Sequence, residues 1–511
     1  MLVKLFGSAV YGVEAITITI EVNVTEGLHT YVVGLADSAV KESIQRIESA
    51  VKSNGYFMPR TKLVINMAPA GIRKSGSAFD LPIAIGVLAA SGQIPNVRLT
   101  DYAIMGELGL DGQVHSIKGA LPIAIQCRKE RFKGLIVPRS NGFEAAIVNQ
   151  LEVYGFGHLS EVIAFFRDRT NARPIVIDTR AIFHASTAVS ELDFSDVKGQ
   201  EGIKRALEIT AAGGHNLILI GPPGAGKTML ARRLPGILPP LSLAEAFETT
   251  KIHSVAGKLV ENTTLMSQRP FRNPHHTISG SALVGGGSIP QPGEISLAHN
   301  GVLFLDELPE FDRSVLEVMR QPMEDRKVLV SRAKQSAEFP ASFMLVAAMN
   351  PCPCGYYSHP TKECNCPPGA VIRYLNKISG PLLDRIDLHV EVIPVPFEEV
   401  TAVKPGETSC RIRERVLAAR ERQRLRYEQT GIHCNAQVTS RYLPVWCKVG
   451  AEARKLLGAT VDSMSLSMRA HDHILKISRT IADLAGSEAI RTEHLAEALQ
   501  FRNLDRDAWG E

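Results

Sequence analysis

The stretch Gly221-Pro222-Pro223-Gly224-Ala225-Gly226-Lys227-Thr228 decides the fold, because it matches G-x-x-x-x-G-K-[ST] at every fixed position. The apolar run 216–220 precedes it, and residues 229–234 follow with helical character. A buried strand, a glycine-rich turn and a helix start are the setting of a phosphate-binding loop, in which backbone N–H groups and the helix dipole face the phosphates. The sequence therefore predicts a nucleoside triphosphate site, with Lys227 on the β- and γ-phosphates and Thr228 on Mg²⁺. The alternative is a glycine turn without a ligand.

A second apolar strand, 301–305, ends in the carboxylates Asp306 and Glu307. A carboxylate at the end of a strand beside the phosphate loop can organise Mg²⁺. We therefore expect Asp306 to hold the metal and Glu307 to polarise the attacking water, so that the triphosphate is hydrolysed and not only bound. A solvated acidic turn is the alternative.

Composition limits the classes of protein that fit. A chain of 511 residues is long enough for about two to four domains. Charged residues make up 22% of the chain and nearly cancel to +4, which excludes a polycation, so nucleic-acid binding would need local basic patches. Neither a signal peptide nor a bilayer-spanning apolar run is visible. We expect a cytoplasmic protein without a membrane partner.

The apolar pattern divides the chain into four segments. Residues 1–165 mix alternating strands such as 15–22 and 62–67 with helices such as 41–53 and 79–91, as in an α+β or α/β domain. Residues 166–196 are predicted to be a linker, 197–395 carry the nucleotide motifs, and 396–511 are helical. The expected fold class is therefore α/β: a P-loop core with a helical C-terminal domain, preceded by a separate mixed domain.

Three further polar residues follow or open predicted elements. Asn350 ends the buried strand 343–349, and Arg385 lies in a short turn before the strand 388–393. Arg469 opens a long helix. In a parallel sheet, Asn350 would face the γ-phosphate or the attacking water. Each arginine, taken alone, is more typical of a surface ion pair than of a catalytic group.

The order of these motifs resembles that of an AAA+ ATPase. Residues 195–505 resemble the magnesium-chelatase-related branch, and the whole chain resembles the ComM/YifB family, including the run Asn350-Pro351-Cys352-Pro353-Cys354-Gly355. The resemblance implies that Asn350 is sensor 1, that Arg385 is an arginine finger for a neighbouring subunit's ATP, and that Arg469 is sensor 2 in a helical lid. It also implies that Val197-Lys198-Gly199-Gln200 contacts the adenine, and that the chain forms a homo-oligomeric ring, expected to be a hexamer.

Two insertions bear on what such a ring would bind. One contains Phe271-Arg272-Asn273-Pro274-His275-His276-Thr277, and the other, 326–339, reads as a hairpin with Arg332 and Lys334 near its tip. The resemblance implies that these insertions project into the pore, where Arg272, Arg332 and Lys334 would contact DNA phosphates. An ordinary solvated hairpin is the alternative. We expect no metal at the two histidines, because neighbouring side chains on a strand point to opposite sides.

Four of the eight cysteines, Cys352, Cys354, Cys364 and Cys366, form a C-x-C-x₉-C-x-C arrangement. Four thiolates can close a tetrahedral zinc site of structural type. The alternative is four reduced thiols in a loop. Cys127, Cys410, Cys434 and Cys447 are scattered and are expected to be ordinary core or surface residues.

The first segment, 1–165, resembles the proteolytic domain of Lon, which has a ribosomal-S5-like fold. The matching stretches are 73–80 and 105–114. A Ser-Lys protease needs a lysine that activates the serine, but the resemblance puts Ala78 at the serine position and Leu121 at the lysine position. Ser77 and Lys118 are close by but out of register. We therefore expect an inactive domain that serves as a scaffold or a DNA-contacting collar.

These inferences lead to one main hypothesis and two alternatives. The main one is a ring-forming ATPase that uses ATP and Mg²⁺ to translocate on DNA, which the resemblance makes a branch-migration helicase of recombination and natural transformation. One alternative is a chelatase-type motor that remodels a protein partner. An ATP-dependent protease is the other, and the missing Ser-Lys pair argues against it.

Overall fold

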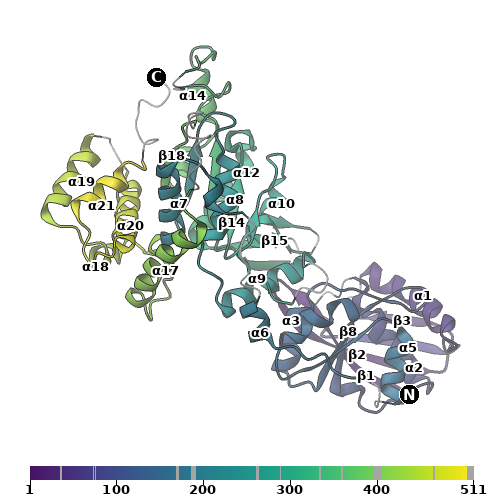
Figure 1. The fold of residues 1–511 in the computed structure, drawn as a ribbon. Helices are drawn as coiled ribbons and strands as arrows, with labels where there is room; N and C mark the ends of the chain where they lie inside the picture. Colours follow the sequence, from purple (N-terminus) through teal and green to yellow (C-terminus); the bar gives the residue numbers. More distant parts are fainter. Residues whose placement is uncertain are drawn as a thin grey trace.

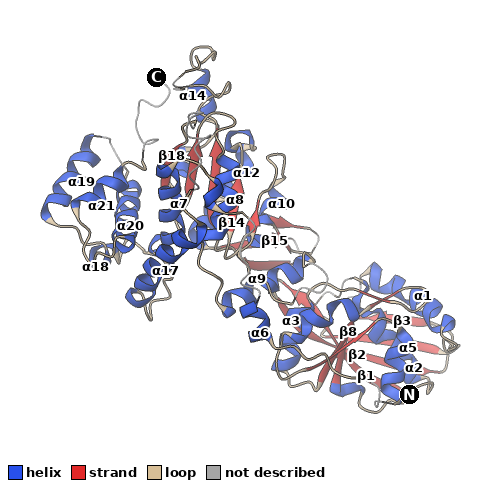
Figure 2. Ribbon diagram, viewed as in Figure 1, coloured by secondary structure: helices blue, strands red, loops and turns tan. Residues whose placement is uncertain are grey.

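The computed structural model describes residues 1–502 apart from 35–36, 73, 75, 169–171, 186–191, 260–263, 288, 333–334, 358, 360, 395–405 and 464–466. The N-terminal domain lies at one end of an elongated molecule, the nucleotide core lies in the middle, and helices α18–α21 pack beside the core (Figure 1). Helices cover the strands in both the N-terminal domain and the core (Figure 2). This arrangement is the mixed α/β architecture that the sequence predicts.

The N-terminal domain is built on a seven-stranded sheet. Its order is β3 (Thr30–Val33), β4 (Lys62–Ala68), β2 (Glu14–Thr25), β1 (Leu2–Tyr11), β5 (Tyr102–Ile104), β8 (Gly134–Pro138) and β9 (Glu152–Phe156). Its helices are α1 (Ser38–Ser53), α2 (Asp80–Ala90), α3 (Ala120–Lys129), α4 (Gly142–Ala146) and α5 (Leu159–Arg167), and β6 (Glu107–Leu108) pairs with β7 (Val114–His115). The predicted strands 15–22 and 62–67 and helices 41–53 and 79–91 are all confirmed. Strand β2 alternates because Ile18, Ile20 and Val22 face the core.

The predicted linker is partly structured. Helix α6 (Thr179–Ala185) lies within it, and the Thr179 hydroxyl donates to the Ile147 carbonyl at 3.1 Å. The Ile175 amide donates to Val153 of β9 at 2.8 Å. Ile175, Ile177 and Phe183 pack on the N-terminal core. Only Ile175 and Ile177 have the two-residue spacing of a strand, and so short a run does not predict an element, which is why the pattern alone did not reveal this packing.

The nucleotide core is a parallel sheet. Its order is β11 (Phe271–Arg272), β14 (Val302–Leu305), β17 (Met344–Met349), β10 (Leu217–Ile220) and β18 (Leu388–Glu391). The helices of this segment are α7 (Glu201–Gly213), α8 (Lys227–Ile237), α9 (Leu243–Ala256), α10 (Gly280–Val284), α11 (Glu294–Leu297), α12 (Arg313–Glu317), α13 (Arg320–Asp325), α14 (Ala370–Leu375) and α15 (Gly380–Leu383). Two hairpins complete it: β12 (Gly285–Gly286) with β13 (Gln291–Pro292), and β15 (Lys327–Arg332) with β16 (Gln335–Pro340). Because the strands are parallel, the ends of β10, β14 and β17 meet at one edge.

Helices α17 (Ser409–Arg426), α18 (Leu443–Trp446), α19 (Ala451–Ser463), α20 (Met468–Leu484) and α21 (Thr492–Leu499) form the C-terminal part. Most of the arginines of α17 bind groups on other elements, and few pair with carboxylates of α17 itself. Arg415 pairs with Glu208 of α7, and Arg426 pairs with the buried Asp483 of α20. These pairs attach α17 to the core on one side and to α20 on the other.

The nucleotide core and the N-terminal domain pack against each other through apolar side chains and hydrogen bonds. Leu241, just before α9, and Ala246, in the first turn of α9, are buried in the N-terminal core. The Gly119 amide donates to the Ser254 carbonyl at 3.1 Å, and the Tyr11 hydroxyl donates to the Ser336 carbonyl of β16 at 2.6 Å. The N-terminal domain is therefore attached both to α9 and to the predicted DNA-contacting hairpin.

Among the described helices, none has both the length and the apolar content needed to cross a bilayer.

Candidate active site

The phosphate loop connects β10 to α8, as the sequence predicts. All four residues of β10 are buried, and α8 begins at Lys227. Gly224 and Gly226 have φ values of +80° and +88°, which residues with a β-carbon rarely adopt. Gly221 is needed for a different reason, because a β-carbon there would lie 2.4 Å from the Val392 carbonyl oxygen. The glycines therefore shape a loop that wraps the start of α8, where the helix dipole favours an anion.

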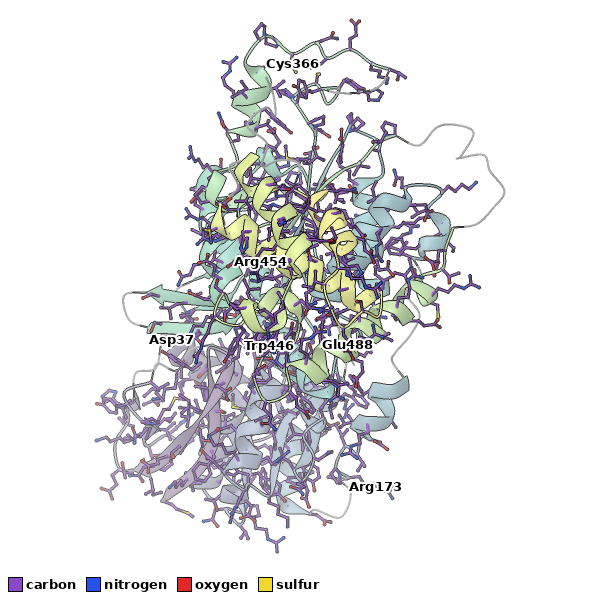
Figure 3. All side chains as sticks on the ribbon, turned by 90° about the vertical axis from the view of Figure 1, so that its left-hand side faces the viewer. Asp37, Arg173, Cys366, Trp446, Arg454 and Glu488 are labelled. Carbon is purple, nitrogen blue, oxygen red and sulfur yellow. The ribbon has the colours of Figure 1, made fainter. Side chains whose placement is uncertain are left out.

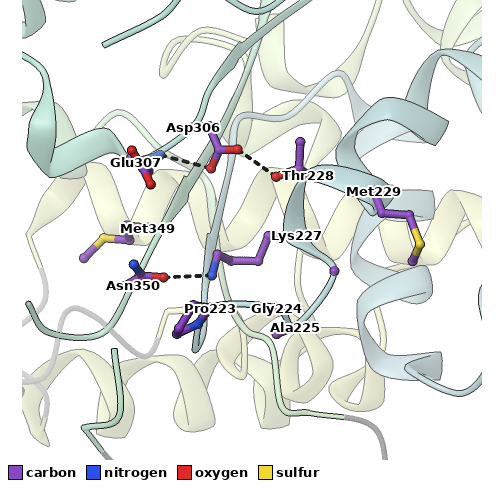
Figure 4. Close-up of a pocket in the computed structure, with 11 residues that line it drawn as sticks. Pro223, Gly224, Ala225, Lys227, Thr228, Met229, Asp306, Glu307, Met349 and Asn350 are labelled. Carbon is purple, nitrogen blue, oxygen red and sulfur yellow. Dashed lines mark hydrogen bonds between the residues drawn. The ribbon is translucent and has the colours of Figure 1, made fainter. Parts of the chain in front are cut away.

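Lys227, the first residue of α8, links the phosphate loop to Asn350, the residue after β17, by hydrogen bonds. Its ammonium group donates to the carbonyls of Gly221 and Pro222 at 2.6 and 3.0 Å and to the Asn350 side-chain oxygen at 3.0 Å (Figure 4). Burial lowers the pKa of Lys227, and the nearby Asp306 and Glu307 oppose this shift. An incoming triphosphate would replace the carbonyl acceptors with charged oxygens, which bind an ammonium more strongly.

Asp306 and Glu307 follow β14 but have different surroundings. The Thr228 hydroxyl donates to Asp306 Oδ2 at 2.7 Å, so a hydroxyl and a carboxylate that suit Mg²⁺ are already adjacent. The Glu307 side chain is 58% exposed and lies 3.5 Å from His276 Nδ1. Asp306 is thus paired with Thr228 beside the phosphate loop, whereas the more exposed Glu307 contacts His276.

The residues converge on one cavity of about 400 Å³. It is lined by Pro223, Gly224, Ala225, Gly226, Lys227, Thr228, Met229, Asp306, Glu307, Met349 and Asn350. Gln200, which precedes α7, donates from Nε2 to the Ala225 carbonyl at 3.1 Å. Its Oε1 is buried and has no hydrogen-bond partner, so it could accept a bond from a nucleotide.

Sequence reasoning missed His276. The two histidines follow β11 in a turn, and their rings lie 4.1 Å apart on the same side, so the expectation that they point oppositely was wrong. In the described part of the chain, the only metal-ligand group of three or more side chains is the cysteine cluster. His276 instead contacts Glu307. The only sequence signal was the position of the histidine pair between the phosphate loop and the acidic strand.

Arg385 and Arg469 lie together, away from this cavity. Arg385 donates to the Pro381 carbonyl at 2.6 Å and pairs with Glu324 at 2.6 Å. Arg469, in the first turn of α20, pairs with the same Glu324 oxygen at 3.1 Å. Neither arginine lines the cavity of its own chain.

The predicted DNA-contacting residues have mixed outcomes. The hairpin is confirmed, and Arg332 ends β15, whereas Lys334 lies outside the described residues. Arg272 lies in β11, and its guanidinium donates two hydrogen bonds to Glu294 at 2.6 and 2.8 Å. The geometry of Arg272 is therefore that of a structural ion pair within the core.

The cysteine cluster forms as predicted. The sulfur atoms of Cys352, Cys354, Cys364 and Cys366 all lie within 4.8 Å of one another. Figure 3 shows Cys366 at the end of the molecule opposite Arg173. Cys127, Cys434 and Cys447 are buried and Cys410 is exposed, all as free thiols.

Comparison with known proteins decides the family. The chain is 45% identical over 504 residues to the YifB protein of Escherichia coli, covering 98% of this chain and 96% of that one. It is 43% identical over 506 residues to the competence protein ComM of Haemophilus influenzae, covering 98% and 97%. This protein belongs to the ComM/YifB family.

Profile matches locate the AAA+ part of this ComM/YifB family member. Residues 193–400 match magnesium chelatase, subunit ChlI, and residues 406–502 match the C-terminal part of that subunit. Residues 20–141 match a further profile described as subunit ChlI of Mg-chelatase. The matches agree with the parallel sheet and phosphate loop, and they support an AAA+ ATPase.

A partial likeness to a protease accompanies these matches. The chain is 34% identical over 167 residues to Lon protease 2 of Bacillus subtilis, covering 30% of this chain and 29% of the protease. In this ComM/YifB family member Ala78 is partly buried, and Leu121 is fully buried in α3. Lys118 lies against Gly257 at the end of α9, where a β-carbon would be 2.9 Å from its Cε. The residues at the expected dyad positions therefore cannot perform Ser-Lys chemistry.

Proposed function

We propose that this protein is a ring-forming ATPase that translocates on DNA, acting in the cytoplasm as a branch-migration helicase in recombination and natural transformation. The observation that carries the proposal is the separation of the catalytic groups into two sets. One set, around Lys227, Asp306 and Glu307, lines the cavity. The other, Arg385 and Arg469, is held at Glu324 outside it.

This separation favours a site shared between subunits. ATP hydrolysis needs cationic groups that stabilise charge on the transferred phosphoryl group. Lys227 is the only lysine or arginine among the residues that line the cavity. A neighbouring chain that brings its Arg385 to this cavity would complete it, and repeating the contact closes a ring, for which we propose six chains.

Thr228 and Asp306 would hold Mg²⁺, which neutralises phosphate charge when it is bound. Asn350, already hydrogen-bonded to Lys227 at 3.0 Å, would orient the γ-phosphate or the attacking water. Glu307 would take the proton of that water, and Gln200 would contact the nucleotide base. The four clustered cysteines would hold zinc.

The DNA part of the proposal rests on the β15–β16 hairpin and on the relatives. Arg332 ends β15, and Lys334, two residues further on in the sequence, lies outside the described residues; we propose that both cations contact DNA phosphates. Cations that track phosphates without reading bases suit a motor that moves along DNA. One relative of nearly equal length is named a competence protein.

The test of the whole proposal is steady-state ATP hydrolysis with no DNA and with single-stranded, duplex and forked DNA. We expect DNA to stimulate turnover in the wild type and not in Glu307→Gln. The chelatase-type alternative is favoured by the profile matches over 193–400 and 406–502. If hydrolysis is robust but no DNA changes it, a motor that remodels a protein partner becomes the better account.

Reversing charge at the hairpin tip tests the DNA contact. In Arg332→Glu/Lys334→Glu, we expect DNA stimulation to disappear while basal hydrolysis stays near wild type, because neither residue has a proposed role in the ATP site. Loss of two phosphate contacts should weaken DNA binding by more than about tenfold at low salt and lower its salt dependence. The matched control is Arg454→Glu/Lys455→Glu, which makes the same change of charge at two exposed cations of α19. Equal stimulation in the hairpin variant and this control would place the DNA contact elsewhere.

A further inference from the structure

The four clustered cysteines have the geometry of a metal site. The Cys352–Cys354, Cys352–Cys364 and Cys354–Cys364 sulfur distances are 3.3, 3.8 and 3.5 Å. Four thiolates bound tetrahedrally to zinc at about 2.3 Å would have sulfur–sulfur distances of about 3.8 Å. A disulfide would need about 2.05 Å. The cluster therefore fits four ligands around one ion and not two disulfides.

The cluster is continuous with the active site through β17. Asn350 accepts a hydrogen bond from Lys227, and Cys352 follows it after one proline. Cys352 is fully buried, and its sulfur accepts a hydrogen bond from the Tyr357 amide at 3.3 Å. Fixing the Cys352 sulfur therefore restricts the backbone that carries the Asn350 side chain.

The cysteine loop also touches the phosphate loop directly. Gly355, the residue after Cys354, has φ +83° and lies against Pro223. A β-carbon at Gly355 would be only 2.5 Å from Pro223 Cδ. This contact joins the segment between two of the cysteines to a residue that lines the nucleotide cavity.

The far end of the loop returns to Asn350. After Cys366 the chain enters α14, and burial raises the pKa of its buried Tyr374, while the nearby Asn350 backbone opposes that shift. The cysteine loop therefore begins next to Asn350 and ends in a helix whose Tyr374 lies near the Asn350 backbone. Without an ion, the described residues of 351–369, which exclude 358 and 360, contain no helix or strand that could hold the two ends of the loop together.

We propose that zinc bound by Cys352, Cys354, Cys364 and Cys366 positions Asn350 and Pro223 for ATP, so that metal occupancy controls nucleotide affinity. The cysteines are then positioning residues of the ATP site. This inference rests on the ATP site of the proposed function and is independent of its DNA-translocating part.

Elemental analysis and nucleotide binding together test this inference. The full-length wild type should contain one zinc per chain. Cys364→Ser/Cys366→Ser should contain none and should bind a fluorescent non-hydrolysable ATP analogue about tenfold more weakly, as expected for loss of one charged hydrogen bond. Cys410→Ser, which changes an exposed thiol on α17, should match the wild type in both measurements.

Stripping the wild type with a zinc chelator and then adding zinc back separates metal loss from misfolding. We expect affinity for the analogue to fall and then recover, while far-UV circular dichroism stays unchanged. A wild type without zinc, or equal affinity with and without zinc, would overturn the inference and leave the ATP site intact. If the zinc-loaded wild type binds no nucleotide, the proposed function fails as well.

Discussion

Replacing Arg385 with alanine is expected to lower ATP turnover by about 10³–10⁵ while leaving nucleotide affinity close to that of the wild type. The affinity should persist because Lys227, Thr228 and Asp306, the cavity groups proposed to hold the phosphates and Mg²⁺, are unchanged. Turnover should fall because a neighbour's arginine is the group that would stabilise charge on the transferred phosphoryl group. Single-turnover hydrolysis and binding of a non-hydrolysable ATP analogue measure the two effects separately.

Mixing variants shows whether the arginine acts between chains. Arg385→Ala retains Glu307, and Glu307→Gln retains Arg385, so a mixed ring contains some complete sites. We expect the mixture to hydrolyse ATP faster than the sum of the two separate proteins. Arg313→Ala, a change at an exposed arginine on α12, serves as the control. Hydrolysis retained by Arg385→Ala alone would contradict the finger assignment.

To act on a neighbour's nucleotide, Arg385 must first leave its contacts with Glu324 and the Pro381 carbonyl. Its side chain is only 10% exposed, and Glu324 holds it together with Arg469. Assembly of a ring must therefore exchange the Glu324 carboxylate for phosphate oxygens of the neighbour's nucleotide. Both ligands are anions, so the exchange need not leave the guanidinium unpaired.

Replacing Glu307 with glutamine is the second change with a large expected effect. The substitution keeps the shape of the side chain and removes its basic carboxylate, so we expect turnover to fall by about 10²–10⁴. Binding of ATP and Mg²⁺ should persist, because the Thr228–Asp306 pair at 2.7 Å is untouched. Steady-state phosphate release and analogue binding on the same preparation measure both quantities.

Glu310→Gln is the matched control, since Glu310 undergoes the same change three residues further on and pairs with Lys377 at the surface. It should hydrolyse ATP at the wild-type rate. Equal loss in both variants would point to a general disturbance after β14. Unchanged turnover in Glu307→Gln would mean that another group activates the water.

Much of the candidate site was predictable because its parts are short and local. The phosphate loop needs only a buried strand, glycines at two positive-φ positions and a helix start, all within 217–237. Asp306 and Asn350 each end an apolar strand, and parallel pairing brings the ends of β14 and β17 to one edge. Apolar periodicity and turn chemistry determine such features without knowledge of the rest of the chain.

Other features depended on partners distant in sequence and could not be predicted. His276 meets Glu307 because β11 pairs beside β14, and the two-residue length of β11 left no periodic signal. Helix α9 has an apolar start that packs on the N-terminal domain, which no local pattern assigns. Arg272 was expected at DNA, but Glu294 accepts its hydrogen bonds.

The sequence alone determined that the chain contains a phosphate loop, a strand-terminal acidic pair and a clustered set of four cysteines, because each depends on spacing within a few residues. Only the tertiary structure decided which groups share a cavity and which do not. Lys227 and Asn350 are brought within 3.0 Å, whereas Arg385 and Arg469 are held on Glu324. The physical reason is that local backbone preferences act over one turn or strand, while the pairing of charges follows from how distant elements pack.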